Sequence, residues 1–252
     1  MRSTKPSAVI AAAVFGVLAL AACTPNDQPT QVEAGVIDAA ARDYVLSSLE
    51  QRTSAADGVW VEDSLEDLLP SHEFAIDGGT PAPLAEGIVV GTVTSVDQGR
   101  GYMIEGDDAA DGTEIPFADS RALWRVIVLT VKTDTRLGDV DKKTIKVGVV
   151  IDGGMDVVKS RDGYLSLGRV ALVLNAPGKF GFDPAMYSIR QSGALLGLVS
   201  ASGKLRFPGL GTESADFVDG LDSIDEVVTE AVAPAEVVDV DQTEGEFIRD
   251  DE

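Results

Sequence analysis

The sequence predicts a mainly β protein with some α structure (α+β). We expect a small antiparallel β-barrel or sandwich, preceded by one or two helices and followed by an acidic, partly disordered tail. Five short runs rich in β-branched residues lie between residues 85 and 210, each bounded by Gly, Asp, Asn or Pro. No recurring helical pattern of about 10 to 15 residues separates them, which disfavours a parallel βαβ sheet. Closure of an antiparallel sheet leaves the fewest strand edges unpaired.

The predicted strands occupy a β domain over residues 85–210. Ile145, Val147, Val149 and Ile151 alternate with other residues, so one face of that strand is expected in the core. The run at 123–131 is apolar at both its odd-numbered and its even-numbered positions, so this strand should be covered on both faces. A last short strand is expected just before Pro208. The five main runs are 88–96, 123–131, 144–151, 170–174 and 195–200.

Residues 31–84 are predicted to contain helices and a connector. A capping box at Thr30 and Glu33 precedes an amphipathic pattern, so we expect a helix that ends near Arg52. A second, short helix is expected over residues 63–69, because Pro70 follows it. Residues 77–83 contain two Gly and two Pro, which predicts a turn and a stiff connector into the β domain.

The charge of the chain is distributed unevenly along it. The whole sequence has 20 Lys and Arg against 42 Asp and Glu, a net charge of -22. The β domain holds 15 of each sign, whereas residues 211–252 hold 1 basic and 15 acidic residues. We therefore expect this tail to contain one marginal helix near residues 219–233 and to be disordered beyond it.

The first 22 residues have the pattern of a bacterial export signal. Arg2 and Lys5 precede an apolar run over residues 8–22, which is shorter than the roughly 20 apolar residues of a spanning helix. The run ends in Leu20-Ala21-Ala22-Cys23, which resembles the lipobox of bacterial lipoproteins at all four positions.

That resemblance implies a defined chemistry for the only cysteine of the chain. It implies that Leu20, Ala21 and Ala22 are recognised by a signal peptidase, that the chain is cleaved before Cys23, and that the Cys23 thiol carries a lipid with fatty acyl chains such as palmitate. Residues 23–30 then form a polar tether. The expected location is the extracytoplasmic face of the cell membrane, with the lipid bilayer as partner through acylated Cys23.

The apolar spacing and turn glycines of the β domain resemble those of small secreted bacterial domains with an OB-like barrel. The similar segments are VVGTVTSV, LTVKTDTRLGD, IKVGVVIDGG, GRVALVLNAPG and GLVSASGKLRFPG, which together cover about half of the chain. Such domains generally have no assigned activity, so the resemblance implies a fold and no functional residue.

We predict no catalytic, cofactor-binding or metal-ligating residue. His72 is the only histidine, and it is expected in a solvated turn after Pro70. One His and one lipidated Cys cannot make a usual zinc site. The acidic loop from Asp107 to Glu114 lacks the EF-hand spacing, although a weak calcium site at Asp107, Asp111 and Glu114 stays open.

These observations favour a non-catalytic surface or envelope module that binds a protein or another ligand. The alternative is an envelope hydrolase or carbohydrate-active enzyme that uses dispersed carboxylates, which 42 acidic residues leave open. A third hypothesis is that the acidic flanks act as a cation-buffering spacer at the membrane. No nucleic-acid partner is expected, because export and a pI near 4.2 both argue against one.

Overall fold

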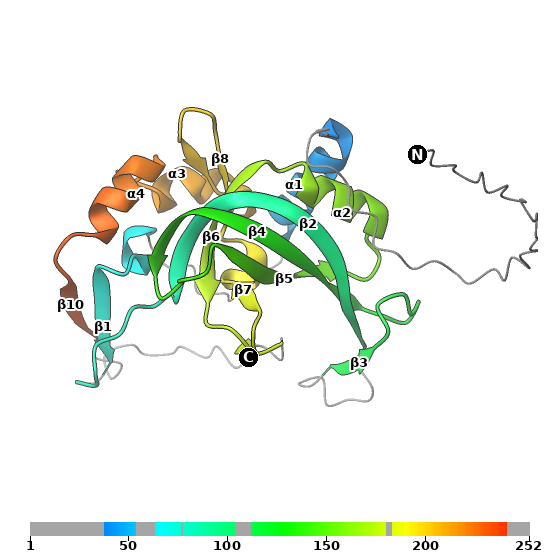
Figure 1. The fold of residues 1–252 in the computed structure, drawn as a ribbon, viewed down its shortest axis with the longest axis horizontal. Coiled ribbons are helices and arrows are strands. Elements are labelled where there is room, and N and C mark those ends of the chain that lie inside the picture. The colour runs from blue at the N-terminus through cyan, green and yellow to red at the C-terminus, as the bar shows by residue number, and fades with distance from the viewer. Residues whose placement is uncertain (1–37, 54–63, 77, 104–111, 180–182, 241–252) are drawn as a thin grey trace, which may run out of the picture. The chain divides into compact units, whose positions relative to one another are not determined.

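The computed structural model describes residues 38–53, 64–76, 78–103, 112–179 and 183–240. These residues form a mixed α/β structure in which eight strands make one large, mostly antiparallel sheet and two more strands pair separately (Figure 1). The predicted leader, residues 1–22, and tether, residues 23–30, lie outside the described residues.

The described residues form four α-helices and ten strands. The helices are α1 (Ala39–Thr53), α2 (Val157–Leu165), α3 (Ser214–Phe217) and α4 (Ile224–Ala231). The strands are β1 (His72–Ile76), β2 (Gly87–Met103), β3 (Thr113–Ile115), β4 (Trp124–Gly138), β5 (Thr144–Asp152), β6 (Arg169–Asn175), β7 (Tyr187–Ile189), β8 (Leu196–Val199), β9 (Leu205–Arg206) and β10 (Glu236–Val240). All five main predicted runs therefore fall on strands.

Five strands are joined in a circuit of hydrogen bonds. β2 pairs with β4, β4 with β5, β5 with β7, β7 with β6, and β6 with β2 again. Only the β5–β7 pairing within this circuit is parallel. β2 can close the circuit because its residues Gly87 to Thr92 pair with β6 on one side while the strand pairs with β4 on the other.

Irregularities in the β2–β4 pairing accommodate the bend of these long strands, which arch across the front of Figure 1. One register shift falls between Val90 and Gly91. A Cβ atom on Gly91 would lie 2.3 Å from the carbonyl oxygen of Lys132, so only glycine permits this approach.

Apolar side chains fill the space enclosed by the strands. The predicted alternation in β5 is confirmed, because Ile145, Val147, Val149 and Ile151 are all buried while Lys146 is exposed. β6 is buried over nearly its whole length. The same cluster of buried residues extends to α1, to the segment after Pro208 and to α4.

The helix predicted to end near Arg52 is α1, described from Ala39 onward. Asp38 caps it, since its carboxylate accepts a hydrogen bond from the Ala41 amide at 3.0 Å. The buried side chains are Ala41, Val45 and Leu49. The proposed capping box at Thr30 lies outside the described residues, and the second predicted helix is a 3₁₀ turn over Glu66–Leu68.

α2 is an element that the sequence pattern did not predict. Asp156 caps it by accepting from the Lys159 amide, and the helix packs on α1 (Figure 1). The contact is close at Gly163, where a Cβ atom would lie 2.3 Å from the carbonyl oxygen of Ala41. The helix is only nine residues long, and four consecutive polar residues interrupt its apolar ones, so its apolar periodicity was too short to detect.

The tail is more ordered than predicted. The helix expected near residues 219–233 is α4, and it begins with a capping box between Ser223 and Glu226. Beyond it, β10 pairs in parallel with β1, with His72 opposite Glu236. The expectation of disorder after the helix is thus wrong for residues 236–240, while residues 241–252 lie outside the described part of the chain.

Candidate functional sites

The residues to which the sequence assigns a chemical role lie outside the described part of the structure. Leu20, Ala21, Ala22 and Cys23 all precede residue 38. Their roles therefore stay predictions from the sequence. None of the described helices combines the length and the apolar character needed to cross a membrane.

His72 does not lie in a solvated turn, which corrects the prediction. It is the first residue of β1 and only 8% exposed. Its Nδ1 atom lies 3.3 Å from the hydroxyl oxygen of Ser71, and its Nε2 atom lies 3.6 Å from a carboxylate oxygen of Glu66. Ser71 is itself buried, so its hydroxyl is not presented to a substrate. The three residues link the 3₁₀ turn to β1.

The acidic loop considered for calcium is only partly described. Asp107 and Asp111 lie outside the described residues, whereas Glu114 is an exposed residue of β3. Glu114 forms an ion pair with Arg100 of β2, so this carboxylate already has a cationic partner. Within the described ranges, no group of three or more His, Cys, Asp or Glu side chains is arranged to hold a metal ion.

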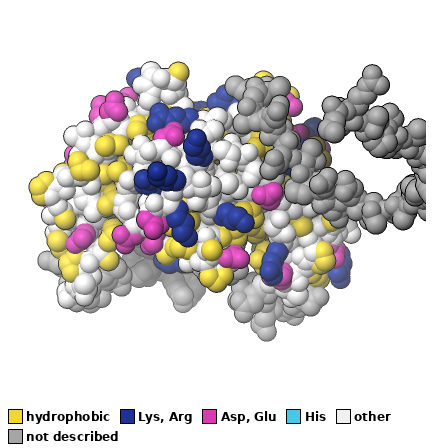
Figure 2. Space-filling model, viewed as in Figure 1, with side chains coloured by type: hydrophobic (Ala, Val, Ile, Leu, Met, Phe, Trp, Pro, Cys, Tyr) yellow, Lys and Arg dark blue, Asp and Glu magenta, His cyan; other side chains and the backbone are white. Residues whose placement is uncertain are grey.

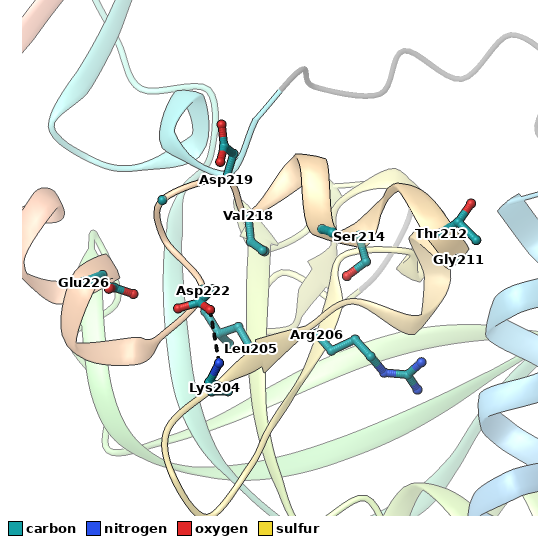
Figure 3. Close-up of a pocket in the computed structure, with 12 residues that line it drawn as sticks. Lys204, Leu205, Arg206, Gly211, Thr212, Ser214, Val218, Asp219, Asp222 and Glu226 are labelled. Atoms are coloured by element: carbon teal, nitrogen blue, oxygen red, sulfur yellow. Dashed lines mark hydrogen bonds and ion pairs between the residues drawn. The ribbon is translucent and has the colours of Figure 1, made fainter.

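One open pocket of about 640 Å³ lies beside β9. Its walls come from β9, from residues 211–215, from the turn at 218–222 and from the start of α4 (Figure 3). The hydroxyl of Ser214 at its base is buried and accepts a hydrogen bond from the Phe207 amide at 2.9 Å. No motif in the sequence marked this pocket, because its lining residues come from several short elements that meet only in the fold.

The charged groups around the pocket are of both signs, and most are already paired. Lys204 lies 3.5 Å from Asp222, and Arg206 extends toward α1, where Glu50 is 3.9 Å away (Figure 3). Glu226 accepts hydrogen bonds from the amide and hydroxyl groups of Ser223. Asp219 points away from the Lys204–Asp222 pair in the same view. This arrangement suits a polar ligand better than catalysis by two free carboxylates.

A second feature is a basic hairpin formed by the ends of β4 and β5 and the turn between them. Residues 132–146 contain five of the chain's 20 Lys and Arg residues but only three carboxylates. We define the basic hairpin by Lys132, Arg136, Lys142, Lys143 and Lys146. In Figure 2, Lys and Arg side chains gather over the middle of the sheet where β2, β4 and β5 pass in front.

Two tyrosines of the sheet have raised pKa values. Burial raises the pKa of Tyr187 on β7, and the carboxylates of Glu86, Asp141 and Asp139 raise it further. Burial also raises the pKa of Tyr102 on β2, with the Glu114 carboxylate adding to the effect. Neither tyrosine lines the pocket, so these shifts reflect the packing of the sheet.

No protein-family model matches the chain, and neither a curated protein nor a solved structure is significantly similar to it. Its function must therefore be inferred from its own residues.

Proposed function

We propose that the chain is a bacterial lipoprotein, anchored through acylated Cys23 to the extracytoplasmic face of the cell membrane, whose folded domain binds a protein or another ligand. The observation behind the proposal is the tetrad Leu20-Ala21-Ala22-Cys23 at the end of a short apolar run. Small residues before a single cysteine suit cleavage at the membrane surface, and the apolar run would bring the thiol to the lipid donor. Two or three acyl groups on Cys23 would anchor the protein stably, whereas a single acyl group would bind the membrane only marginally.

For the folded part we propose a closed barrel of the OB type. The circuit β2-β4-β5-β7-β6-β2 and its single parallel pairing support this proposal. So does α2, which lies in the chain between the third and fourth strands of the circuit. Because apolar side chains pack the interior, a ligand would bind on the outer surface or in the pocket beside β9.

Two of the carboxylates at the pocket already have partners within the protein, which favours binding over hydrolysis. Asp222 is paired with Lys204, and Glu226 is held by Ser223 at the start of α4. A glycosidase needs two carboxylates free to exchange protons with a substrate and set about 5 to 10 Å apart. At this pocket two of the three carboxylates have structural partners instead.

The anchor is tested by expressing the full chain in a bacterium with a labelled palmitate analogue. The parent chain should lose residues 1–22, incorporate the label and enter the detergent phase on phase separation. Cys23→Ser should abolish the label and move the protein to the aqueous phase, because no other cysteine is present. The neighbouring substitution Thr24→Ser is the matched control and should leave both results unchanged. A labelled or detergent-phase Cys23→Ser protein would refute the anchor.

A further inference from the structure

Lys132 and Lys146 of the basic hairpin are directed away from the core. Their neighbours Val131, Ile145 and Val147 are buried, and successive strand residues point to opposite faces. Lys132 pairs with Thr144, and Lys146 pairs with Thr130, so the two lysines are diagonal neighbours across β4 and β5. Diagonal neighbours lie about 7 Å apart, which brings two ammonium groups together on the outer face of the sheet.

Most of this positive charge is not neutralised locally. In the described part of the chain, no carboxylate lies within ion-pair distance of Lys132, Lys142, Lys143 or Lys146. Of the hairpin's three carboxylates, Asp134 forms an ion pair with Arg169 of β6. The other two carboxylates, Asp139 and Asp141, raise the pKa of Tyr187 on β7. Four exposed lysines are thus left to attract an external anion.

We propose that the basic hairpin docks the domain on the anionic phospholipid surface of the membrane that holds the lipid anchor. This inference rests on the proposed function, because the anchor is what makes the membrane the nearest polyanion. Fourteen residues lie between Cys23 and Asp38, so even a fully extended tether keeps Asp38 within about 55 Å of the bilayer. Tethering of this kind gives an effective concentration in the millimolar range.

The chemistry of lysine suits this partner. An ammonium group is a compact, strongly hydrated point charge on a flexible stem, which fits a field of mobile headgroups better than one fixed ligand. Each lysine near an anionic membrane strengthens binding about fivefold. The acidic tail would be repelled by the same surface, and screening limits both effects to about 10 Å. The two effects together favour one orientation, with the basic hairpin toward the bilayer.

The test uses residues 23–252 with Cys23→Ser, so that neither leader nor lipid contributes. The buried core lies between Ala41 and Val227, so this chain keeps all of it. Binding is measured by co-sedimentation with phosphatidylglycerol–phosphatidylcholine vesicles and with pure phosphatidylcholine vesicles at low ionic strength. We expect binding to the anionic vesicles only, weakening as salt is added.

Two double variants with the same change of charge locate the effect. Lys132→Gln with Lys146→Gln should weaken binding to anionic vesicles about 25-fold, at about fivefold for each lysine. Lys159→Gln with Arg161→Gln removes two cations from α2, outside the hairpin and the pocket, and should bind like the parent. Circular dichroism and thermal melting verify that both variants keep the fold.

Three results would overturn the proposal. They are equal binding by the two double variants, equal binding to zwitterionic vesicles, and a preference for single-stranded nucleic acid over vesicles at equal phosphate concentration. A preference for nucleic acid would mean that the hairpin binds polyanions in general rather than the membrane surface. Because the assayed chain has no lipid, failure of Cys23 acylation in cells would leave this result unchanged, and the two proposals fail separately.

Discussion

At the scale of single residues, Asp119 shows how hydrogen bonds within one turn lower the pKa of a carboxyl group. Arg121 donates to it from both its guanidinium and its backbone amide, with N–O distances of 2.8 to 3.1 Å. The side-chain hydrogen bond is the main cause that lowers the pKa of Asp119 from 3.8 to about 2. Since the folded state holds the ionised form, this interaction supports the fold above about pH 4. Its contribution is lost as the pH falls toward 2.

We predict that the Asp119 carboxyl titrates near pH 2 when followed by NMR. Arg121→Gln should raise the midpoint part of the way to 3.8, because the backbone amide at position 121 still donates. Arg100→Gln is the control, since Arg100 pairs with Glu114 instead, and it should leave the Asp119 midpoint unchanged. A midpoint near 4 in the parent chain would contradict this account.

Single residues were the hardest features to predict from the sequence. Arg125 and Lys132 are both cations on β4, but Arg125 is buried and donates to the carbonyl oxygens of Phe117, Asp119 and Gly153. Those acceptors come from two different turns, so their position is a consequence of the fold. His72 was misjudged for the same reason, because its burial depends on β10 and the 3₁₀ turn.

At the scale of elements, strands with strong β-branched patterns were predictable and short elements were not. β5 was recognised from its alternation, and its burial pattern agrees. β7 has three residues and β10 follows a highly acidic stretch, so neither has a local signal that outweighs its surroundings. The pocket beside β9 was missed with them, because its lining residues, all between Lys204 and Glu226, come from several short elements that share no motif.

The attachment of β10 to β1 can be tested at one amide. The Glu236 amide donates to the carbonyl oxygen of Ser71 at 2.8 Å and begins the parallel pairing. Glu236→Pro removes this donor, so residues 236–240 should lose protection from hydrogen exchange. The melting temperature should change little, because Val237 and Val238 are exposed. Glu236→Ala keeps the amide and should keep the protection. Unchanged protection in the proline variant would show that β10 is held by other contacts.

At the scale of the whole molecule, one core joins segments that differ greatly in charge. The buried cluster includes α1 residues from the acidic stretch 23–84, the neutral strands, and apolar residues of the acidic stretch 211–252. The charge of -22 therefore does not separate the chain into folded and unfolded parts. The acidic residues lie largely on exposed positions around a shared interior, which explains why charge alone predicted too much disorder in the tail.

This shared core predicts that the tail helices and the sheet unfold together. The Phe217 ring of α3 is 3% exposed and contacts the Phe207 ring edge-to-face, with centroids 5.2 Å apart. Phe217→Ala should lower the free energy of unfolding by about 3 to 5 kcal/mol, and the protein should still unfold in a single transition. Both results are measured by circular dichroism during unfolding in urea. Val232→Ala truncates a side chain that is 73% exposed and should change stability by less than about 0.5 kcal/mol. A second transition in Phe217→Ala, with the sheet unfolding at the parent's midpoint, would mean that the acidic tail folds independently of the sheet.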